Sequence, residues 1–210
     1  MEEKTIATIE TITDAQIGRI SDRFKEKCRK NVASLPKDAT QQVIEDEGDQ
    51  LAQEMFETLR KRVEARSGMI VRRVKVNRKQ SPKQAIDATG RVKYINDDVL
   101  ANMPGEGAEE VDVYFFNLRK NVSVDDLDRE YERRGLAPDP YAQAQVNADD
   151  PAFADAHPNA TQWDNKNRHA SYSAFCRLDV ERIVSVSRGG NGWSDRWWFG
   201  GVRKSRTLGN

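Results

Sequence analysis

The sequence predicts an α+β protein, in which an N-terminal helical hairpin packs with a mixed or antiparallel sheet of about four or five strands that ends in a C-terminal β-meander. Helical periodicity dominates the start of the chain and two-residue alternation dominates its end. This segregation favours α+β over a doubly wound parallel sheet. The 210 residues are expected to form a flexible N-terminus (1–12), one domain (13–204) and a flexible tail (205–210). Within the domain, the hairpin covers 13–67 and the α+β body covers 68–204.

Two amphipathic helices are expected first. Thr13 and Gln16 form a capping-box pattern at the start of the first helix, which stops before Pro36. Its apolar stripe consists of Ile17, Ile20, Phe24 and Cys28. The second helix begins near Asp38 and ends at Gly68. Its stripe consists of Ile44, Gly48, Leu51, Met55, Leu59 and Val63. Such stripes must be covered, either by each other and the sheet or by a partner chain.

The body begins with a half-buried strand in 68–79, followed by a short helix around 84–88 and a segment at 92–95. The strongest strand pattern is "EEVDVYFFNL" (109–118). The helix after it starts at Ser123, and Gly135 is typical of its C-terminal stop.

A long connecting segment covers 137–163. Asp139-Pro140 and Asp150-Pro151 each place an N-cap residue before a proline, which predicts two short helices. Three short strand patterns follow, at 169–178, 181–188 and 194–203, and predict an antiparallel meander.

The last of these patterns lies in "GGNGWSDRWWFGGVRK" (189–204), which holds three of the four tryptophans. In a strand, Trp197 and Trp198 point to opposite faces, so they cannot form one stacking platform. We expect this stretch to be mostly core, and the alternative is a partly exposed Trp198 or Trp193 that stacks with Arg196 on a base or sugar.

Several classes of protein are disfavoured. No stretch is long and apolar enough to cross a bilayer, and the acidic N-terminus lacks a secretory pattern, which indicates a cytoplasmic protein with no membrane partner. Cys28 and Cys176 are interpreted as free thiols. Neither a phosphate-binding glycine loop nor a G-x-S-x-G motif occurs, so no cofactor and no catalytic residue is predicted.

Charge is unevenly distributed along the chain. Residues 60–93 carry a net charge of +10, and residues 95–160 carry −10. A basic segment of this kind can contact phosphates. The candidate nucleic-acid-binding residues are Arg66, Arg72, Arg73, Lys75, Arg78, Lys79, Arg196 and Trp198. The opposing interpretation is that the two blocks pack together and neutralise each other.

A third group contains acidic and histidine side chains in 139–169. It consists of Asp139, Asp149, Asp150, Asp155, His157, Asp164 and His169. Carboxylates and histidines can perform acid–base chemistry or bind a metal, which would suit a metal-dependent hydrolase. No metal-ligand spacing is present, however, and the aspartates before proline already serve as N-caps. No metal site is therefore predicted.

The stretches "DPYAQAQVNADDPAFADAHPNATQW" and "DRWWFGGVRK" resemble a group of uncharacterised bacterial proteins from small-genome lineages, over most of 13–204. The resemblance implies a standalone bacterial protein and carries over no activity and no site residue.

The leading hypothesis is a soluble, cytoplasmic, non-enzymatic binding or protein-interaction module. Its partner would be another protein, or a second copy bound through the amphipathic helices. Nucleic-acid binding through 60–93 and a metal-dependent hydrolase built from 139–169 are the alternatives.

Overall fold

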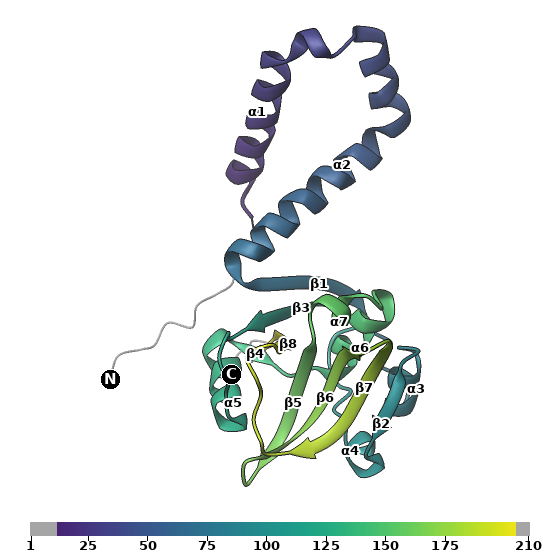
Figure 1. Cartoon of the computed structure of the whole chain (residues 1–210), viewed down its shortest axis with the longest axis vertical. Helices are drawn as coiled ribbons and strands as arrows, with labels where there is room; N and C mark the ends of the chain where they lie inside the picture. Colours follow the sequence, from purple (N-terminus) through teal and green to yellow (C-terminus); the bar gives the residue numbers. More distant parts are fainter. Residues whose placement is uncertain (1–11, 205–210) are drawn as a thin grey trace, which may run out of the picture. The chain divides into compact units, whose positions relative to one another are not determined.

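The computed structural model describes residues 12–204, which divide between Ser67 and Gly68 into two compact units. One unit is helical and the other contains the β-sheet (Figure 1). The division falls where the sequence separates the expected hairpin from the α+β body. The segments expected to be flexible, 1–12 and 205–210, lie outside the described residues except for Ile12. Within 12–204, no helix combines the length and the apolar character that a membrane span requires.

The helical unit consists of α1 (Asp14–Lys30), the short 3-10 helix η1 (Val32–Ser34) and α2 (Lys37–Ser67). The predicted capping box is confirmed, because the Thr13 hydroxyl accepts from the Gln16 amide and the Gln16 side chain accepts from the Thr13 amide. No residue of either helix is buried. The structure thus differs from the expected packed hairpin, because most residues of the two apolar stripes are exposed, and Cys28, Gly48, Met55 and Leu59 are only half-buried.

The other unit is built on one mixed sheet of eight strands. These are β1 (Met69–Lys75), β2 (Val92–Ile95), β3 (Glu110–Asn117), β4 (Leu136–Ala137), β5 (Asn159–Lys166), β6 (His169–Leu178), β7 (Glu181–Gly189) and β8 (Trp198–Arg203). Their order is β1-β3-β8-β5-β6-β7-β2, with β4 beside β8. Only the β2–β7 and β5–β8 pairs are parallel. The α+β class is confirmed, but the expected four or five strands were too few.

The C-terminal meander also differs from the prediction. β5, β6 and β7 form the antiparallel succession, whereas β8 lies between β3 and β5 and does not pair with β7. The loop 190–197 carries the chain back from β7, so that β8 enters the interior of the sheet. β5 falls partly in the segment expected to be a connection. Its buried residues include Asn159, Thr161 and Gln162, whose polarity is typical of loops.

The helices of this unit are α3 (Pro82–Asp87), α4 (Asp97–Ala101), α5 (Val124–Arg134), α6 (Pro140–Asp149) and α7 (Phe153–Ala156). Phe115 and Phe116 are consecutive on β3 and therefore point to opposite faces of the sheet. The ring of Phe115 contacts Phe153 of α7 at 4.8 Å between centroids, and that of Phe116 contacts Tyr131 of α5 at 5.5 Å. α3, α4, α6 and α7 bury the main core on the Phe115 face. On the Phe116 face, which we call the open face, α5 is the covering helix.

The local capping signals are largely confirmed. α5 begins after Ser123 and ends at Gly135, which has the left-handed φ of 63° that favours glycine. α6 begins after Asp139, whose carboxylate accepts from an amide in its first turn. The second short helix starts at Phe153, two residues later than the proline of Asp150-Pro151 predicts.

Candidate functional site

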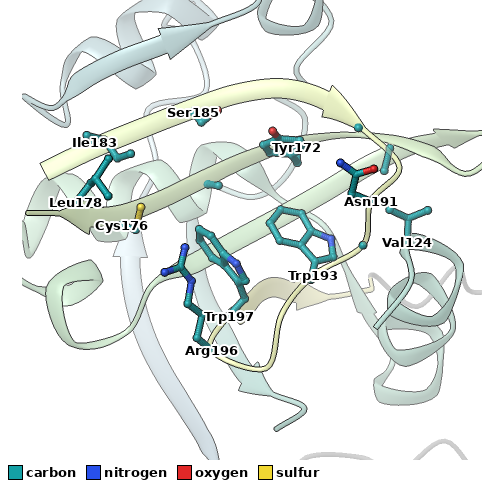
Figure 2. Close-up of a pocket in the computed structure, with 14 residues that line it drawn as sticks. Val124, Tyr172, Cys176, Leu178, Ile183, Ser185, Asn191, Trp193, Arg196 and Trp197 are labelled. Atoms are coloured by element: carbon teal, nitrogen blue, oxygen red, sulfur yellow. The ribbon is translucent and has the colours of Figure 1, made fainter. Parts of the chain in front are cut away.

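A hollow of about 400 Å³ lies on the open face over β6 and β7, bounded by the loop 190–197 (Figure 2). We call it the aromatic hollow. Its principal lining residues are Tyr172, Cys176, Ile183, Trp193, Arg196 and Trp197. Val124, the first residue of α5, lines one side of the hollow.

The floor of the hollow follows from strand alternation. Tyr172, Ala174 and Cys176 are alternate residues of β6 and therefore share one face. Ser185 of β7 pairs with Ala174, and Ile183 pairs with Cys176. The small side chains of Ala174 and Ser185 lie side by side in this floor, and larger apolar groups surround them. The result is a shallow, largely apolar depression.

The loop 190–197 is held in place by backbone contacts. The amides and carbonyls of Val122 and Trp193 exchange hydrogen bonds of 2.9 and 2.8 Å. Asn117 Nδ2 also donates to the Trp197 carbonyl at 2.9 Å. Gly192 has a φ of 74°, and a Cβ there would lie 2.5 Å from the Val122 carbonyl oxygen. Only glycine fits this close approach, so the wall of the hollow has a fixed position.

Trp193 is the anchor of an aromatic cluster. Its Nε1 donates to Gln162 Oε1 at 2.9 Å. Its ring lies at centroid distances of 5.2 Å from Tyr172, 5.4 Å from Trp197 and 5.7 Å from Phe199, in edge-to-face arrangements. Such arrangements are the favourable ones for aromatic pairs. Trp193 is therefore fixed in the wall, and Trp197 and Tyr172 present the outer aromatic surface.

Several polar groups at the hollow are unused. The Tyr172 hydroxyl, the Trp197 indole N–H, the Asn191 amide and the Arg196 guanidinium make no hydrogen bond to any residue in 12–204. Arg196 is exposed, lies 5.2 Å from the centroid of the Trp197 ring, and has no ion pair within the described part of the chain. It is the only charged residue of the lining. The hollow therefore combines apolar surface with free donors and one positive charge, which is typical of a binding site.

Cys176 is half-buried in the floor. Burial raises the pKa of its thiol, and the nearby Arg196 and Arg91 only partly oppose this effect. A raised pKa keeps the thiol protonated at neutral pH, and the thiolate is the nucleophilic form. The lining contains neither a histidine nor a carboxylate that could act as its base. Cys176 therefore contributes apolar surface to the hollow.

The basic and acidic blocks are joined by ion pairs. Arg73 lies 3.3 Å from Glu110 and 3.9 Å from Asp112 on the neighbouring strand. Arg78 forms a bidentate pair with the buried Asp139, at 2.9 and 2.6 Å. Part of the positive charge of 60–93 is therefore neutralised inside the α+β unit.

The remaining candidates of the basic segment lie in different surroundings. Arg72 lies over the ring of Phe153 at 5.3 Å, on the helix-covered side. Lys75 and Lys79 are exposed and have no ion pair within 12–204. Arg66 lies in the last turn of α2, in the helical unit.

Arg196 and Trp198 lie on opposite faces of the sheet. Arg196 belongs to the aromatic hollow, whereas Trp198 packs against the main core and against His157 at 5.1 Å between ring centroids. The predicted separation of the two adjacent tryptophans is confirmed, because Trp197 contacts Trp193 on the open face.

The acidic and histidine residues of 139–169 are dispersed. The Asp155 carboxylate accepts hydrogen bonds from Arg182 and Arg177, and the Arg182 guanidinium holds the pKa of this carboxyl below its usual value. His157 contacts aromatic rings, while His169 Nδ1 lies 3.0 Å from the Asn167 carbonyl. Within the described ranges, no group of three or more acidic, histidine or cysteine side chains is placed to hold a metal ion.

A polar cluster that sequence reasoning missed lies in the interior. Gln143 and Asn147 of α6 each donate to Asn159 Oδ1 of β5, at 2.9 and 3.0 Å. Ser173 donates to Gln143 Oε1 at 2.5 Å. All four side chains are fully buried. Satisfied polar groups of this kind fix one packing arrangement, so this cluster holds α6 on the sheet.

No family model, no curated protein and no solved structure matches this chain.

Proposed function

We propose that this chain is a non-enzymatic binding protein, and that the aromatic hollow receives an extended segment of a partner protein. The segment would carry apolar side chains next to carboxylates. One observation carries the proposal. The aromatic hollow on the open face is lined by apolar and aromatic side chains, and Arg196 is the only charged residue of this lining.

The extent of the apolar surface favours a polypeptide as the ligand. Ile183 and Ser185 pair with Val92 and Tyr94 of the edge strand β2. Val92 and Tyr94 are 43% and 55% exposed, and Leu178 at the end of β6 is 57% exposed. The apolar surface thus continues from the hollow across β7 to the sheet edge. A strip that crosses several strands suits an extended chain better than a compact small molecule.

Electrostatics favour an acidic segment. Arg196 is exposed and unpaired within 12–204, and no carboxylate lines the hollow to compete for it. A guanidinium can bind a carboxylate through two parallel hydrogen bonds. The free indole N–H of Trp197 and the Asn191 amide can donate to backbone carbonyls of the same segment.

The two alternatives have less support. Nucleic acid would need a continuous basic surface, but Arg73 and Arg78 are paired with carboxylates, and Trp198 lies on the other face from Arg196. A hydrolase would need convergent acid–base groups, whereas Asp139 and Asp155 are each occupied by arginines. We therefore propose only the binding function.

The test is fluorescence anisotropy with the full chain and three labelled probes. These are a peptide that alternates Glu with Leu and Phe, the same peptide with Lys in place of Glu, and a single-stranded DNA. We expect only the acidic peptide to bind well. Arg196→Glu and Trp197→Ala should each weaken binding by at least about tenfold, which corresponds to about 1.4 kcal/mol.

Lys79→Glu is the matched charge control, because Lys79 is also exposed and unpaired but belongs to the segment after β1. It should leave the affinity unchanged. The proposal is refuted if no peptide binds, if the basic peptide or the DNA binds as tightly as the acidic peptide, or if the two hollow variants behave like wild type.

A further inference from the structure

Helix α2 carries an apolar stripe of which half the residues are exposed and the others, Gly48, Met55 and Leu59, are only half-buried. Ile44, Leu51 and Val63 of this stripe are 57%, 39% and 54% exposed, and no residue among 37–67 is buried. At 31 residues, α2 is about 46 Å long. Helices in proteins are stabilised mainly by packing of an amphipathic face. An exposed apolar stripe of this length therefore indicates an interaction surface.

The stripe is complementary to itself when it is read in the opposite direction. Consider two α2 helices that run antiparallel and cross between Gln53 and Glu54. Ile44 of one copy is then level with Val63 of the second copy, and Gly48 is level with Leu59 of the second copy. A small residue thus faces a large one, and an apolar residue faces an apolar one. The same surface on both copies is the condition for a two-fold symmetric interface.

Charge follows the same symmetry. In this register, Glu45 is level with Arg62 of the second copy, and Glu47 is within one residue of Lys61 of the second copy. None of these four residues forms an ion pair with a residue in the described part of the chain. By contrast, Arg60 is already paired with Glu57 and Glu64 of its own helix. The unpaired acidic and basic residues therefore lie where a second antiparallel copy would pair them.

We propose that α2 is a dimerisation helix and that its partner is a second copy of this chain, bound antiparallel. Two symmetry-related sets of Glu45, Glu47, Lys61 and Arg62 flank the apolar contact. Helix α1 of the same unit has its own exposed apolar residues, Ile17, Ile20 and Phe24. A dimer therefore contains four helices whose apolar surfaces can pack together. This dimer does not depend on the aromatic hollow, and it would present two hollows in one assembly.

The experiment is a charge exchange on the full chain, with mass measured by light scattering after size exclusion and by sedimentation. Wild type should be a dimer. K61E/R62E places two new carboxylates of each copy opposite Glu45 and Glu47 of the other copy, and should raise the dimer dissociation constant by at least about tenfold. E45K/E47K should have the same effect. Mixing the two variants should restore dimers, because opposite charges then face each other at both ends of the heterodimer. At one end Glu45 and Glu47 face Lys61 and Arg62, and at the other end the introduced carboxylates face the introduced lysines.

K75E/K79E is the control, since it changes the net charge as much as K61E/R62E but lies in the α+β unit. It should remain dimeric. The helix content of every variant, followed by circular dichroism, should stay at the wild-type level once dimers are formed. A monomeric wild type at high concentration would overturn the proposal. So would dimers that survive both K61E/R62E and E45K/E47K, or variants that do not associate on mixing.

Discussion

The buried ion pair between Arg78 and Asp139 provides a sharp test of the α+β unit. The two side chains are only 10% and 4% exposed. Asp139 also caps α6, because its Oδ1 accepts from the Ala142 amide at 2.9 Å. Arg78 in turn donates to the Ala108 carbonyl at 3.0 Å. Asp139→Ala removes the charge and the cap, whereas Asp139→Asn removes the charge and keeps an N-cap acceptor.

The two roles have different magnitudes. Removing one partner of a buried ion pair leaves the other charge uncompensated and costs about 3–5 kcal/mol. Losing an N-cap costs about 1 kcal/mol. Asp139→Ala should therefore lower the free energy of unfolding by about 4–6 kcal/mol, and Asp139→Asn by about 1 kcal/mol less. Arg78→Met combined with Asp139→Asn should cost at least about 2 kcal/mol less than the sum of the single changes, because no unpaired charge remains.

The assay is urea unfolding followed by tryptophan fluorescence. All four tryptophans lie between 163 and 198, so the signal reports the α+β unit. The reasoning fails if Asp139→Ala costs less than about 1 kcal/mol, which is the value expected for the cap alone. It also fails if the effects of Arg78→Met and Asp139→Asn are additive.

Three further predictions concern other parts of this unit. Gly201→Ala should cost about 1–3 kcal/mol in urea unfolding, since its Cβ would lie 2.9 Å from the Ala137 carbonyl oxygen; a neutral result would show that β4 can move away. Because arginines depress the pKa of Asp155, its contribution to stability is present at neutral pH and is lost as the pH falls below about 4. Asp155→Asn should thus be less stable at pH 7 and lose less stability in acid, and parallel pH profiles would contradict this. Iodoacetamide should modify Cys176 more slowly than free cysteine, because burial raises the pKa of this thiol. Once bound in the hollow, the acidic peptide should slow the reaction further. Mass spectrometry of the fragment that contains Cys176 measures the extent of modification.

Local signals predicted the local structure well. The capping box at Thr13, the Ser123 N-cap and the Gly135 stop all lie where the structure has them. Each depends on a hydrogen bond or a backbone angle within a few residues, so neighbouring sequence is sufficient to specify it. The spacing of the apolar residues changes from helical to alternating at Gly68, which is also where the contacts divide into two units.

Strand pairing could not be predicted in the same way. β8 was located approximately, but its neighbours are β3 and β5 and not β7. β5 was missed because the buried Asn159 and Gln162 have hydrogen-bond partners that are distant in the sequence. Asn159 accepts from α6, while Gln162 links Trp193 to the helix α5. Polar residues whose partners are distant in sequence have the composition of a loop until the fold brings those partners together.

The aromatic hollow depends both on local sequence pattern and on long-range strand pairing. Alternation alone requires Trp197 and Trp198 to point to opposite faces, and the structure agrees. Which of the two faces is open depends on the route of the loop 190–197, and this route is set by Gly192 packing against the Val122 carbonyl. With β8 beside β7, as the meander predicts, the loop would be a tight turn and would leave no wall. With β8 between β3 and β5, the loop must cross the sheet, and it brings Trp193, Arg196 and Trp197 over β6. The long-range strand order therefore creates the site, although its side chains were all visible in the sequence.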